Sequence, residues 1–275
     1  MNAAEKKETQ NSVLAAKGDI LRLCRRAGSV GAHLGGCLSL AEILTVLYTR
    51  HLRFDPENPL WDARGRFVLS KGHGGIAQYA AMHQAGILTD AEMAKSVLGE
   101  DTVLYKHPQR NPLRGIEFSG GSLGQGLAFA VGEAMAVRQK GFFARVYALV
   151  GDGELNEGSI WEALAVAGHQ ELSNLTVIVD VNGLQLDGFT KDVQRADDLA
   201  ARFSAFGFAV LSVDGHDVSA LDEAFLFTSA RPTAILAKTK KGHGVSFAED
   251  NADWHSRVLT DAEYAIACRE LGVDA

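Results

Sequence analysis

The chain has 275 residues, of which 47% are hydrophobic and 22% are charged, as is typical of a globular protein with a substantial core. Its net charge of −7 and its scattered lysines and arginines argue against binding to a nucleic-acid backbone. No apolar run approaches the ~20 residues of a membrane-spanning helix. Three cysteines without a CxxC motif indicate a reducing compartment, so we expect a cytoplasmic protein without nucleic-acid or membrane partners.

The N-terminal segment is polar and mixed in charge, which is typical of neither a signal peptide nor a transit peptide. We predict a flexible N-terminus over residues 1–11 and a single domain over residues 12–275. Apolar residues recur at helical spacing from residue 12 to 26, which predicts a helix. A glycine-rich stretch then leads into a second helix, for which Ser39 and Glu42 have the spacing of a capping box.

Three loop histidines follow one another along the first half of the chain. His33 lies in the first glycine-rich stretch, His73 follows the strand expected at residues 66–70, and His107 precedes a proline in an irregular region. A strand-to-helix junction such as SKGHGG favours an anion, although His73 could instead be a helix cap. Alone, His33 and His107 read more simply as surface or turn histidines.

Another short helix is expected over residues 88–99, and the glycine-rich segment FSGGSLGQG at residues 118–126 precedes a longer helix that should end near Gln139. So many glycines indicate close backbone approach to a helix or to a ligand. Neither this segment nor residues 151–158 has glycines at all three positions of the GxGxxG motif, so the sequence does not favour nucleotide binding.

Residues 145–182 predict a strand, a turn, a helix and a second strand, which together make a βαβ unit with parallel strands. Asp152 and Asn182 each follow a strand, so both should lie at the edge where open α/β sheets bind ligands. Their oxygens suit Mg²⁺ or Ca²⁺, and an ion held by few protein groups usually bridges to phosphate. A tight turn with Asp152 as a helix cap explains the local pattern equally well.

Further strands are expected at residues 208–213 and 233–238, with helices near residues 199–206 and 220–229. About five strands then alternate with helices, which predicts an α/β fold with a doubly wound, mainly parallel sheet and helices on both faces. His216 and Asp217 are expected to cap the helix that follows them. The long loop near the C-terminus carries His243 and His255, and a loop of this length is more often functional than idle.

The text GDGELNEGSIWEAL, followed by VDVNGLQLDG, resembles the transketolase family of thiamine diphosphate enzymes. The resemblance runs from about residue 12 to the end and implies the diphosphate-binding (PP-type) domain of the thiamine diphosphate-binding fold. It implies a metal ion, Mg²⁺ or Ca²⁺, held by Asp152, Asn182 and the main-chain carbonyl of Leu184. The implied contacts to thiamine diphosphate come from His73, Gly121, Ser122, Leu123, Gly153, Asn182 and His255.

The order and spacing of four histidines also match the family. The resemblance implies that His33, His107 and His255 act as catalytic groups that hydrogen-bond the sugar or transfer protons, while His73 contacts the diphosphate. The family has a glycine where Lys106 precedes His107 in this chain. As a hypothesis, Glu157 couples paired active sites across an interface, and charge compensation at a helix N-terminus is the simpler alternative.

The implied activity is transfer of a two-carbon glycolaldehyde unit from a ketose phosphate to an aldose acceptor. The glutamate that activates the cofactor belongs to a second domain in the family, and no counterpart precedes Ala275. The sequence therefore predicts the N-terminal subunit of a split transketolase, active with a separate pyrimidine-binding C-terminal subunit in an α2β2 assembly. The alternatives are a subunit of a 2-oxoacid dehydrogenase or deoxyxylulose-phosphate synthase, a catalytically silent regulatory subunit, and an unrelated α/β binding module.

Overall fold

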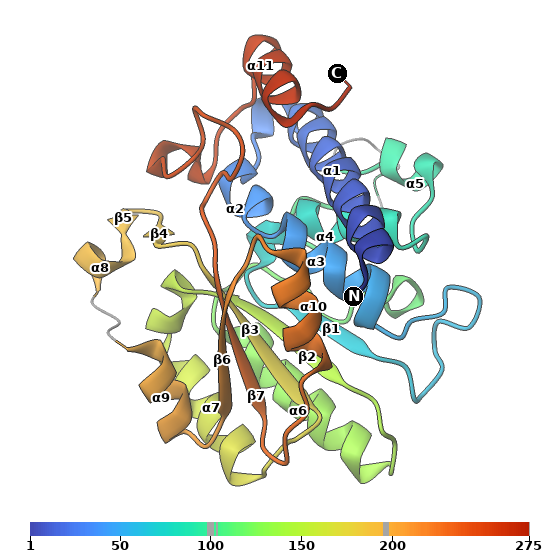
Figure 1. Cartoon of the computed structure of the whole chain (residues 1–275), viewed down its shortest axis with the longest axis vertical. Coiled ribbons are helices and arrows are strands. Elements are labelled where there is room, and N and C mark those ends of the chain that lie inside the picture. The colour runs from blue at the N-terminus through green and yellow to red at the C-terminus, as the bar shows by residue number, and fades with distance from the viewer. Residues whose placement is uncertain (98–101, 103, 195–197, 275) are drawn as a thin grey trace.

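A sheet of five parallel strands forms the centre of the computed structural model, which describes residues 1–97, 102, 104–194 and 198–274 (Figure 1). The strand order is β1-β2-β3-β7-β6. The strands are β1 (Arg66–Leu69), β2 (Val146–Gly151), β3 (Leu175–Val181), β6 (Ala209–Asp214) and β7 (Thr233–Lys238). A small antiparallel hairpin of β4 (Leu184–Gln185) and β5 (Gly188–Phe189) follows β3. The predicted set of parallel strands is confirmed.

Helices cover both faces of this sheet, as predicted (Figure 1). On one face lie α1 (Ala3–Arg26), α2 (Leu34–Leu38), α3 (Ala41–Val46), α4 (Gly75–Gln84) and α10 (Val218–Leu226). Helix α11 (Asp261–Leu271) packs against α1 beyond the end of the sheet (Figure 1). On the other face lie α6 (Gln125–Gln139), α7 (Gly158–His169) and α9 (Leu199–Ala205). The short helices α5 (Asp90–Ala94) and α8 (Thr190–Val193) lie outside these two layers. Part of the helix expected at residues 88–99 lies outside the described residues.

Successive side chains of a strand point to opposite faces of the sheet, so the hydrophobic interior consists of two cores, one on each face. In β1, Phe67 and Leu69 pack into the core beneath α1, α3 and α4, while Val68 packs into the core beneath α6 and α7. The central strands β2 and β3 are almost completely buried on both faces, which is why both appear in the sequence as mainly apolar runs. In the described part of the chain, none of the helices is both long enough and apolar enough to span a membrane.

The N-terminal segment differs from the flexible stretch predicted for residues 1–11, because α1 already begins at Ala3. Asn2 caps this helix: its side-chain oxygen accepts hydrogen bonds from the backbone N–H groups of Ala4 and Glu5, each at 3.0 Å. The Glu5 carboxylate accepts in return from the backbone N–H of Asn2 at 2.7 Å. This capping box satisfies the free donors at the start of the helix, which the polar composition of the segment had obscured.

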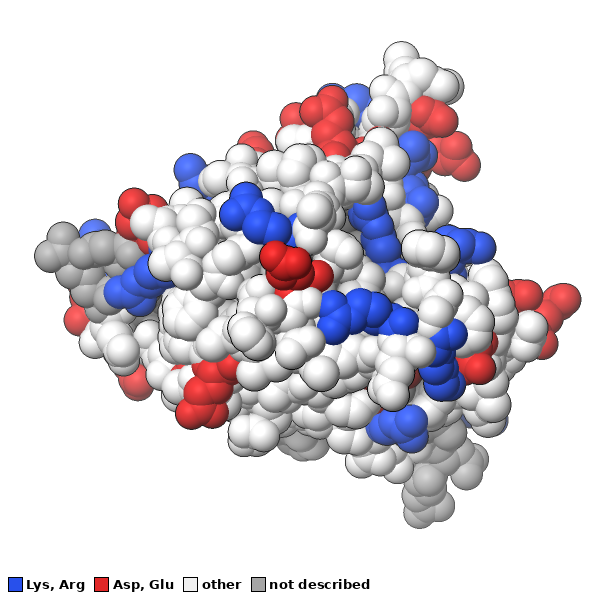
Figure 2. All heavy atoms as spheres, turned by 90° about the horizontal axis from the view of Figure 1, so that it is seen from below, with Lys and Arg blue, Asp and Glu red and all other residues white. Residues whose placement is uncertain are grey.

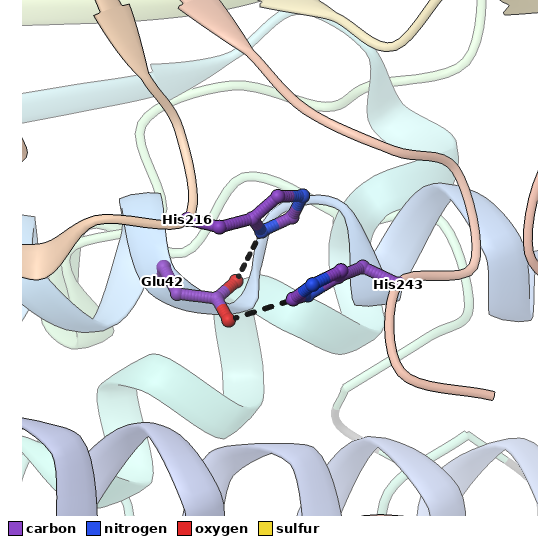
Figure 3. Close-up of side chains that lie close together, drawn as sticks. All are labelled: Glu42, His216 and His243. Carbon is purple, nitrogen blue, oxygen red and sulfur yellow. Dashed lines mark hydrogen bonds and ion pairs between the residues drawn. The ribbon is translucent and has the colours of Figure 1, made fainter.

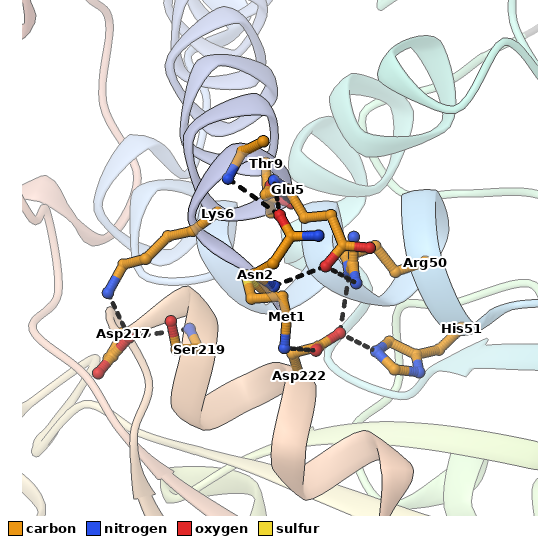
Figure 4. Close-up of polar contacts among 11 residues, drawn as sticks. Met1, Asn2, Glu5, Lys6, Thr9, Arg50, His51, Asp217, Ser219 and Asp222 are labelled. Carbon is orange, nitrogen blue, oxygen red and sulfur yellow. Dashed lines mark hydrogen bonds and ion pairs between the residues drawn. The ribbon is translucent and has the colours of Figure 1, made fainter.

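A buried carboxylate holds the same end of α1 against α10 (Figure 4). The N-terminal ammonium of Met1 lies 3.2 Å from Oδ2 of Asp222, and Arg50 and His51 bind Oδ1 of Asp222 at 2.8 and 2.9 Å. Asp222 is almost completely buried, so the three donors compensate for the loss of its hydration. The segment is therefore anchored by tertiary contacts that its own sequence does not reveal.

The capping box predicted from Ser39 and Glu42 is wrong. Helix α3 begins at Ala41, and Leu40 occupies its N-cap without a side-chain hydrogen bond. The Ser39 hydroxyl instead donates to Asp180 at 2.8 Å, and the Glu42 carboxylate is directed toward the buried ammonium of Lys17 and the ring of His216. Both side chains thus have buried partners outside the helix, and these partners override the local capping pattern.

Figure 2 shows the molecule from below relative to Figure 1. Basic and acidic side chains are interspersed there among uncharged ones.

Replacing Gly168 in α7 with alanine should lower the free energy of unfolding by roughly 3 kcal/mol or more. A Cβ atom at this position would overlap the main-chain carbonyl oxygen of Phe206, which cannot move without displacing the loop before β6. The matched change Gly132→Ala in α6 places its methyl group in open space and should raise stability by roughly 0.5–1 kcal/mol. Urea denaturation of both variants tests this difference, and equal effects would contradict it.

Candidate functional site

The carboxyl ends of four neighbouring strands surround a cavity of 330 Å³. Lys71 follows β1, Asp152 follows β2, Asn182 follows β3 and Lys241 follows β7, and all four side chains line the cavity. The sequence-based expectation that Asp152 and Asn182 share one edge of the sheet is therefore confirmed. Predicted site residues that line the cavity are His73, Leu123, Asp152, Gly153, Glu157, Asn182, Leu184 and His255.

Backbone hydrogen bonds fix the side chains of the two predicted metal ligands. The carboxylate of Asp152 accepts from the N–H groups of Gly153 and Gly183 at 2.9 and 2.7 Å. The side-chain carbonyl of Asn182 accepts from the N–H of Leu184, the first residue of β4, at 3.0 Å. Each of these oxygens keeps a further lone pair. Burial, together with the nearby Asp180, raises the pKa of the Asp152 carboxyl to about 6.

Asp180, inside β3, organises the floor of the cavity. It is completely buried and accepts from the Lys71 ammonium at 2.6 Å, the Asn182 amide at 2.9 Å and the hydroxyls of Ser39 and Thr239. Burial acts to raise its pKa, but Lys71 and the hydroxyl donors hold it below the usual value. Sequence reasoning missed this residue. A charged residue within the otherwise apolar strand VIVDV was the available signal.

Two lysines that the sequence did not single out give the cavity positive charge. Nζ of Lys71 is paired with Asp180, whereas Nζ of Lys241 lies 2.9 Å from Nδ1 of His255. Burial and the charge of Lys71 lower the pKa of Lys241 to about 8. Since a negative group between the two ammonium groups would relieve this repulsion, the cavity suits an anion such as a diphosphate.

Glu154 connects the cavity wall to the glycine-rich loop before α6. Its buried carboxylate accepts from the N–H groups of Gly124 and Gly151 at 2.8 and 3.1 Å, and from the Ser70 hydroxyl at 2.5 Å. Burial raises the pKa of this carboxyl despite these donors. The contacts hold the loop beside the ends of β1 and β2, and sequence reasoning had not assigned Glu154 a role.

The glycine-rich loop itself approaches the segment after β1 closely. A Cβ atom at Gly72 would lie 2.7 Å from the carbonyl carbon of Gly120, so glycine is needed for this contact, as the density of glycines predicted. Of the three residues expected to contact the cofactor from this loop, Leu123 lines the cavity. Gly121 and Ser122 are exposed on the loop and do not line it.

The four histidines selected from the sequence form one group in the structure. The ring centroid of His33 lies 5.4 Å from that of His73, 5.3 Å from that of His107 and 5.4 Å from that of His255. The rings of His73 and His255 are also 5.4 Å apart. Nδ1 of His33 is buried and has no hydrogen-bond partner among the described residues. The group therefore extends from the cavity, at His73 and His255, outward through His33 to His107.

These imidazoles should stay neutral well below neutral pH. Burial, followed by nearby cations and histidines, lowers the pKa of His33 to about 3 and that of His255 to about 4. NMR of the ring nitrogens, assigned through His33→Gln and His255→Gln, should show no protonation of either residue above pH 5. Acidification from pH 6.5 toward pH 4 should also lower stability, because only the unfolded imidazoles then bind protons. Titration of either ring near pH 6.5 would contradict the burial of these imidazoles.

Glu157 occupies the N-cap position of α7, where its side chain makes no capping hydrogen bond. It is exposed at the rim of the cavity. This position is open to a partner molecule and is also next to a helix N-terminus, so the coupling role stays a prediction.

A second group, formed by Glu42, His216 and His243, has ligand atoms within 4.8 Å of one another (Figure 3). Nε2 of His216 accepts from the backbone N–H of Lys240, so its Nδ1 carries a proton and donates to Glu42 at 3.1 Å. The Lys17 ammonium lies 2.7 Å from Glu42 and 3.3 Å from Nδ1 of His243. The imidazole rings stack at 3.6 Å, so their in-plane lone pairs cannot converge on one ion. The group ties helices and loops together rather than holding a metal.

This arrangement corrects one prediction for the loop after β6. His216 does not cap α10, because its Nδ1 is hydrogen-bonded to Glu42 and its Nε2 accepts from the backbone N–H of Lys240. Asp217 alone is the cap, and its carboxylate accepts from the backbone N–H of Ser219 at 2.8 Å.

Comparison with known proteins gives concordant results. Residues 19–275 match the family model described as transketolase, thiamine diphosphate binding domain. The chain is 40% identical over 249 residues to a 6-deoxy-6-sulfo-D-fructose transketolase subunit from a Clostridium strain, covering 89% of this chain and 90% of that protein. It is 38% identical over 243 residues to one of the apulose-4-phosphate transketolase subunits of Actinobacillus succinogenes, covering 88% of each.

Longer transketolases match over part of their length. Human transketolase is 41% identical over 237 residues, which is 85% of this chain and 37% of the human protein. The crystal structure of Campylobacter jejuni transketolase superposes with a TM-score of 0.87 at 31% identity, covering 100% of this chain and 44% of that one. These matches confirm the resemblance found in the sequence: the chain belongs to the transketolase family of transferases and contains its thiamine diphosphate binding domain.

Proposed function

We propose that this chain is the diphosphate-binding subunit of a cytoplasmic two-subunit transketolase. With thiamine diphosphate and Mg²⁺ or Ca²⁺, the enzyme would transfer a two-carbon glycolaldehyde unit from a ketose or ketose phosphate to an aldose acceptor. The observation that carries the proposal is the continuous arrangement of oxygen ligands, two lysines and four histidines at the carboxyl edge of one parallel sheet. Three free, buried cysteines support the cytoplasmic location.

The donor groups at this edge fit a metal diphosphate. Asp152, Asn182 and the main-chain carbonyl of Leu184 would supply hard oxygen ligands to the ion. Lys71 and Lys241 provide positive charge for the diphosphate oxygens in the same cavity. When bound, thiamine diphosphate supplies the nucleophilic carbon and the electron sink that cleavage of a carbon–carbon bond requires, and the protein supplies orientation and proton transfer.

The histidines are suited to the sugar hydroxyl groups. A neutral imidazole has one donor nitrogen and one acceptor nitrogen, and the lowered pKa values keep His33 and His255 in this form near pH 7. Nδ1 of His33 has no hydrogen-bond partner among the described residues, so in the tautomer protonated at Nε2 it can accept a proton or a hydrogen bond from a substrate hydroxyl. We assign the same kind of role to His107, whose pKa is lowered by burial and by Lys106.

A separate subunit would complete the active site. Relatives of nearly the same length are named as transketolase subunits, which supports the existence of a partner subunit. We propose that this partner carries the pyrimidine-binding domain and that the assembly is α2β2. In such an assembly Glu157, at the exposed rim, would couple the paired sites. A Glu157→Gln complex with unchanged activity and unchanged cofactor binding would count against this coupling.

The proposal is tested by assaying glycolaldehyde transfer from a ketose phosphate. The chain should be inactive alone and active when mixed with a pyrimidine-binding subunit, thiamine diphosphate and Mg²⁺. A complex that binds the cofactor without transferring any glycolaldehyde would support the alternative of a catalytically silent regulatory subunit.

A further inference from the structure

Lys106 introduces a cation directly before His107, at a position where the family resemblance leads us to expect glycine. Its Nζ lies 3.3 Å from the carbonyl oxygen of Val30 and 3.2 Å from that of Gly31. Both carbonyls belong to the loop that carries His33. The lysine thus connects the two segments that present the outer histidines of the group.

Main-chain carbonyls hold the ammonium group of Lys106, and no carboxylate of the described residues neutralises its charge. Main-chain carbonyls are uncharged acceptors, and an ammonium group has three donors, so two carbonyls leave one N–H available. Among the described residues, no carboxylate forms an ion pair with Lys106. Lys106 is half-buried and keeps one N–H donor, so its ammonium group can bind an anion from outside the chain.

Cations flank the histidine group at both ends. Burial is the main cause of the lowered pKa of His33 and of His107, and the charge of Lys106 lowers both further. This charge therefore lies beside the outer end of the group. Lys71 and Lys241 act in the same way on His73 and His255, at the cavity. If a substrate that reacts near the cavity follows the row of histidines past His33, its far end comes toward Lys106.

On the basis of the proposed function, we propose that Lys106 is a specificity-determining residue that binds a tetrahedral oxyanion at the far end of the sugar substrate. The oxyanion is a phosphate or a sulfonate, since both present several charged oxygens to a compact ammonium group. An uncharged sugar of the same length gains nothing from this contact. Lys106 therefore gives the enzyme a preference for anionic acceptors that comes from this subunit.

The test compares three acceptors of equal chain length in the assembled enzyme: glyceraldehyde 3-phosphate, its sulfonate analogue sulfolactaldehyde, and glyceraldehyde. Lys106→Met keeps the apolar stem and removes the charge. It should lower kcat/KM for the preferred anionic acceptor about tenfold, equivalent to about 1.4 kcal/mol, mainly through KM. Activity with glyceraldehyde should stay unchanged. Lys106→Arg should retain the preference, and the control Lys140→Met, which removes an exposed charge paired with Asp62, should have no effect.

The outcomes separate the possible explanations. A loss confined to the phosphate or to the sulfonate identifies the oxyanion, whereas an equal loss with all three acceptors would show a purely structural anchor and overturn the proposal. If the wild-type complex transfers no glycolaldehyde, binding of the same compounds can be followed through the histidine NMR signals. Tighter binding of an anionic compound that Lys106→Met abolishes would support the assignment without the transketolase function, and equal affinities would overturn it.

Discussion

Replacing Asp152 with asparagine should weaken Mg²⁺-dependent binding of thiamine diphosphate by the assembled enzyme at least about 100-fold, since loss of outer-shell partners alone typically costs 10–100-fold. The substitution keeps the size of the side chain but removes the anionic oxygen that the ion requires. Isothermal titration calorimetry measures the change. The control Asp62→Asn alters an exposed carboxylate outside the cavity and should leave binding unchanged.

The same variant should not be less stable than the wild type without cofactor. Burial and Asp180 raise the pKa of Asp152 to about 6, above its ordinary value of 3.8, so its ionised form is unfavourable in the folded protein. Any stability linked to its proton is present below pH 3.8 and lost as the pH rises through about 6. The proton also competes with the metal, so metal affinity should fall as the pH is lowered through 6. A large loss of stability in Asp152→Asn would point instead to a structural role.

Replacing Lys71 with methionine should lower the free energy of unfolding of the chain by about 3–5 kcal/mol. Asp180 would keep its buried carboxylate but lose the ammonium group 2.6 Å away, and removal of one partner from a buried ion pair leaves an uncompensated charge. Urea denaturation followed by circular dichroism measures the change. The double variant Lys71→Met/Asp180→Asn removes the charge as well and should recover much of the loss. A single variant as stable as the wild type would show that the pair contributes little.

The sequence predicted the parts of the site that depend on local order along the chain. Apolar runs marked the strands, and the residues directly after them, Asp152 and Asn182, had to meet because parallel strands end at one edge. The roles of the histidines came from the family resemblance, since His33 and His107 alone had a simpler structural explanation and His73 had a helix cap as its alternative. The structure adds that His33 lies at the centre of the group, in contact distance of the other three rings.

The features of the site that the sequence did not predict depend on tertiary contacts. The roles of Asp180 and Lys71 follow from their pairing across 109 positions of sequence, and those of Lys17 and Glu42 from a contact between α1 and α3. No local pattern predicts such pairs, although a charge inside an apolar strand is a signal that a partner exists. The capping box at the start of α1 was different, because its Asn-x-x-Glu spacing was visible and was outweighed by the polar composition of the segment.

The central claim is that the carboxyl edge of this sheet holds a metal diphosphate. A crystal structure of the assembled enzyme with thiamine diphosphate and Mg²⁺ tests it most directly. We expect the ion at about 2.0–2.1 Å from side-chain oxygens of Asp152 and Asn182 and from the main-chain carbonyl of Leu184, with the diphosphate beside Lys71 and Lys241. An ion bound elsewhere, such as at Glu42, His216 and His243, or a cofactor outside the cavity, would contradict it.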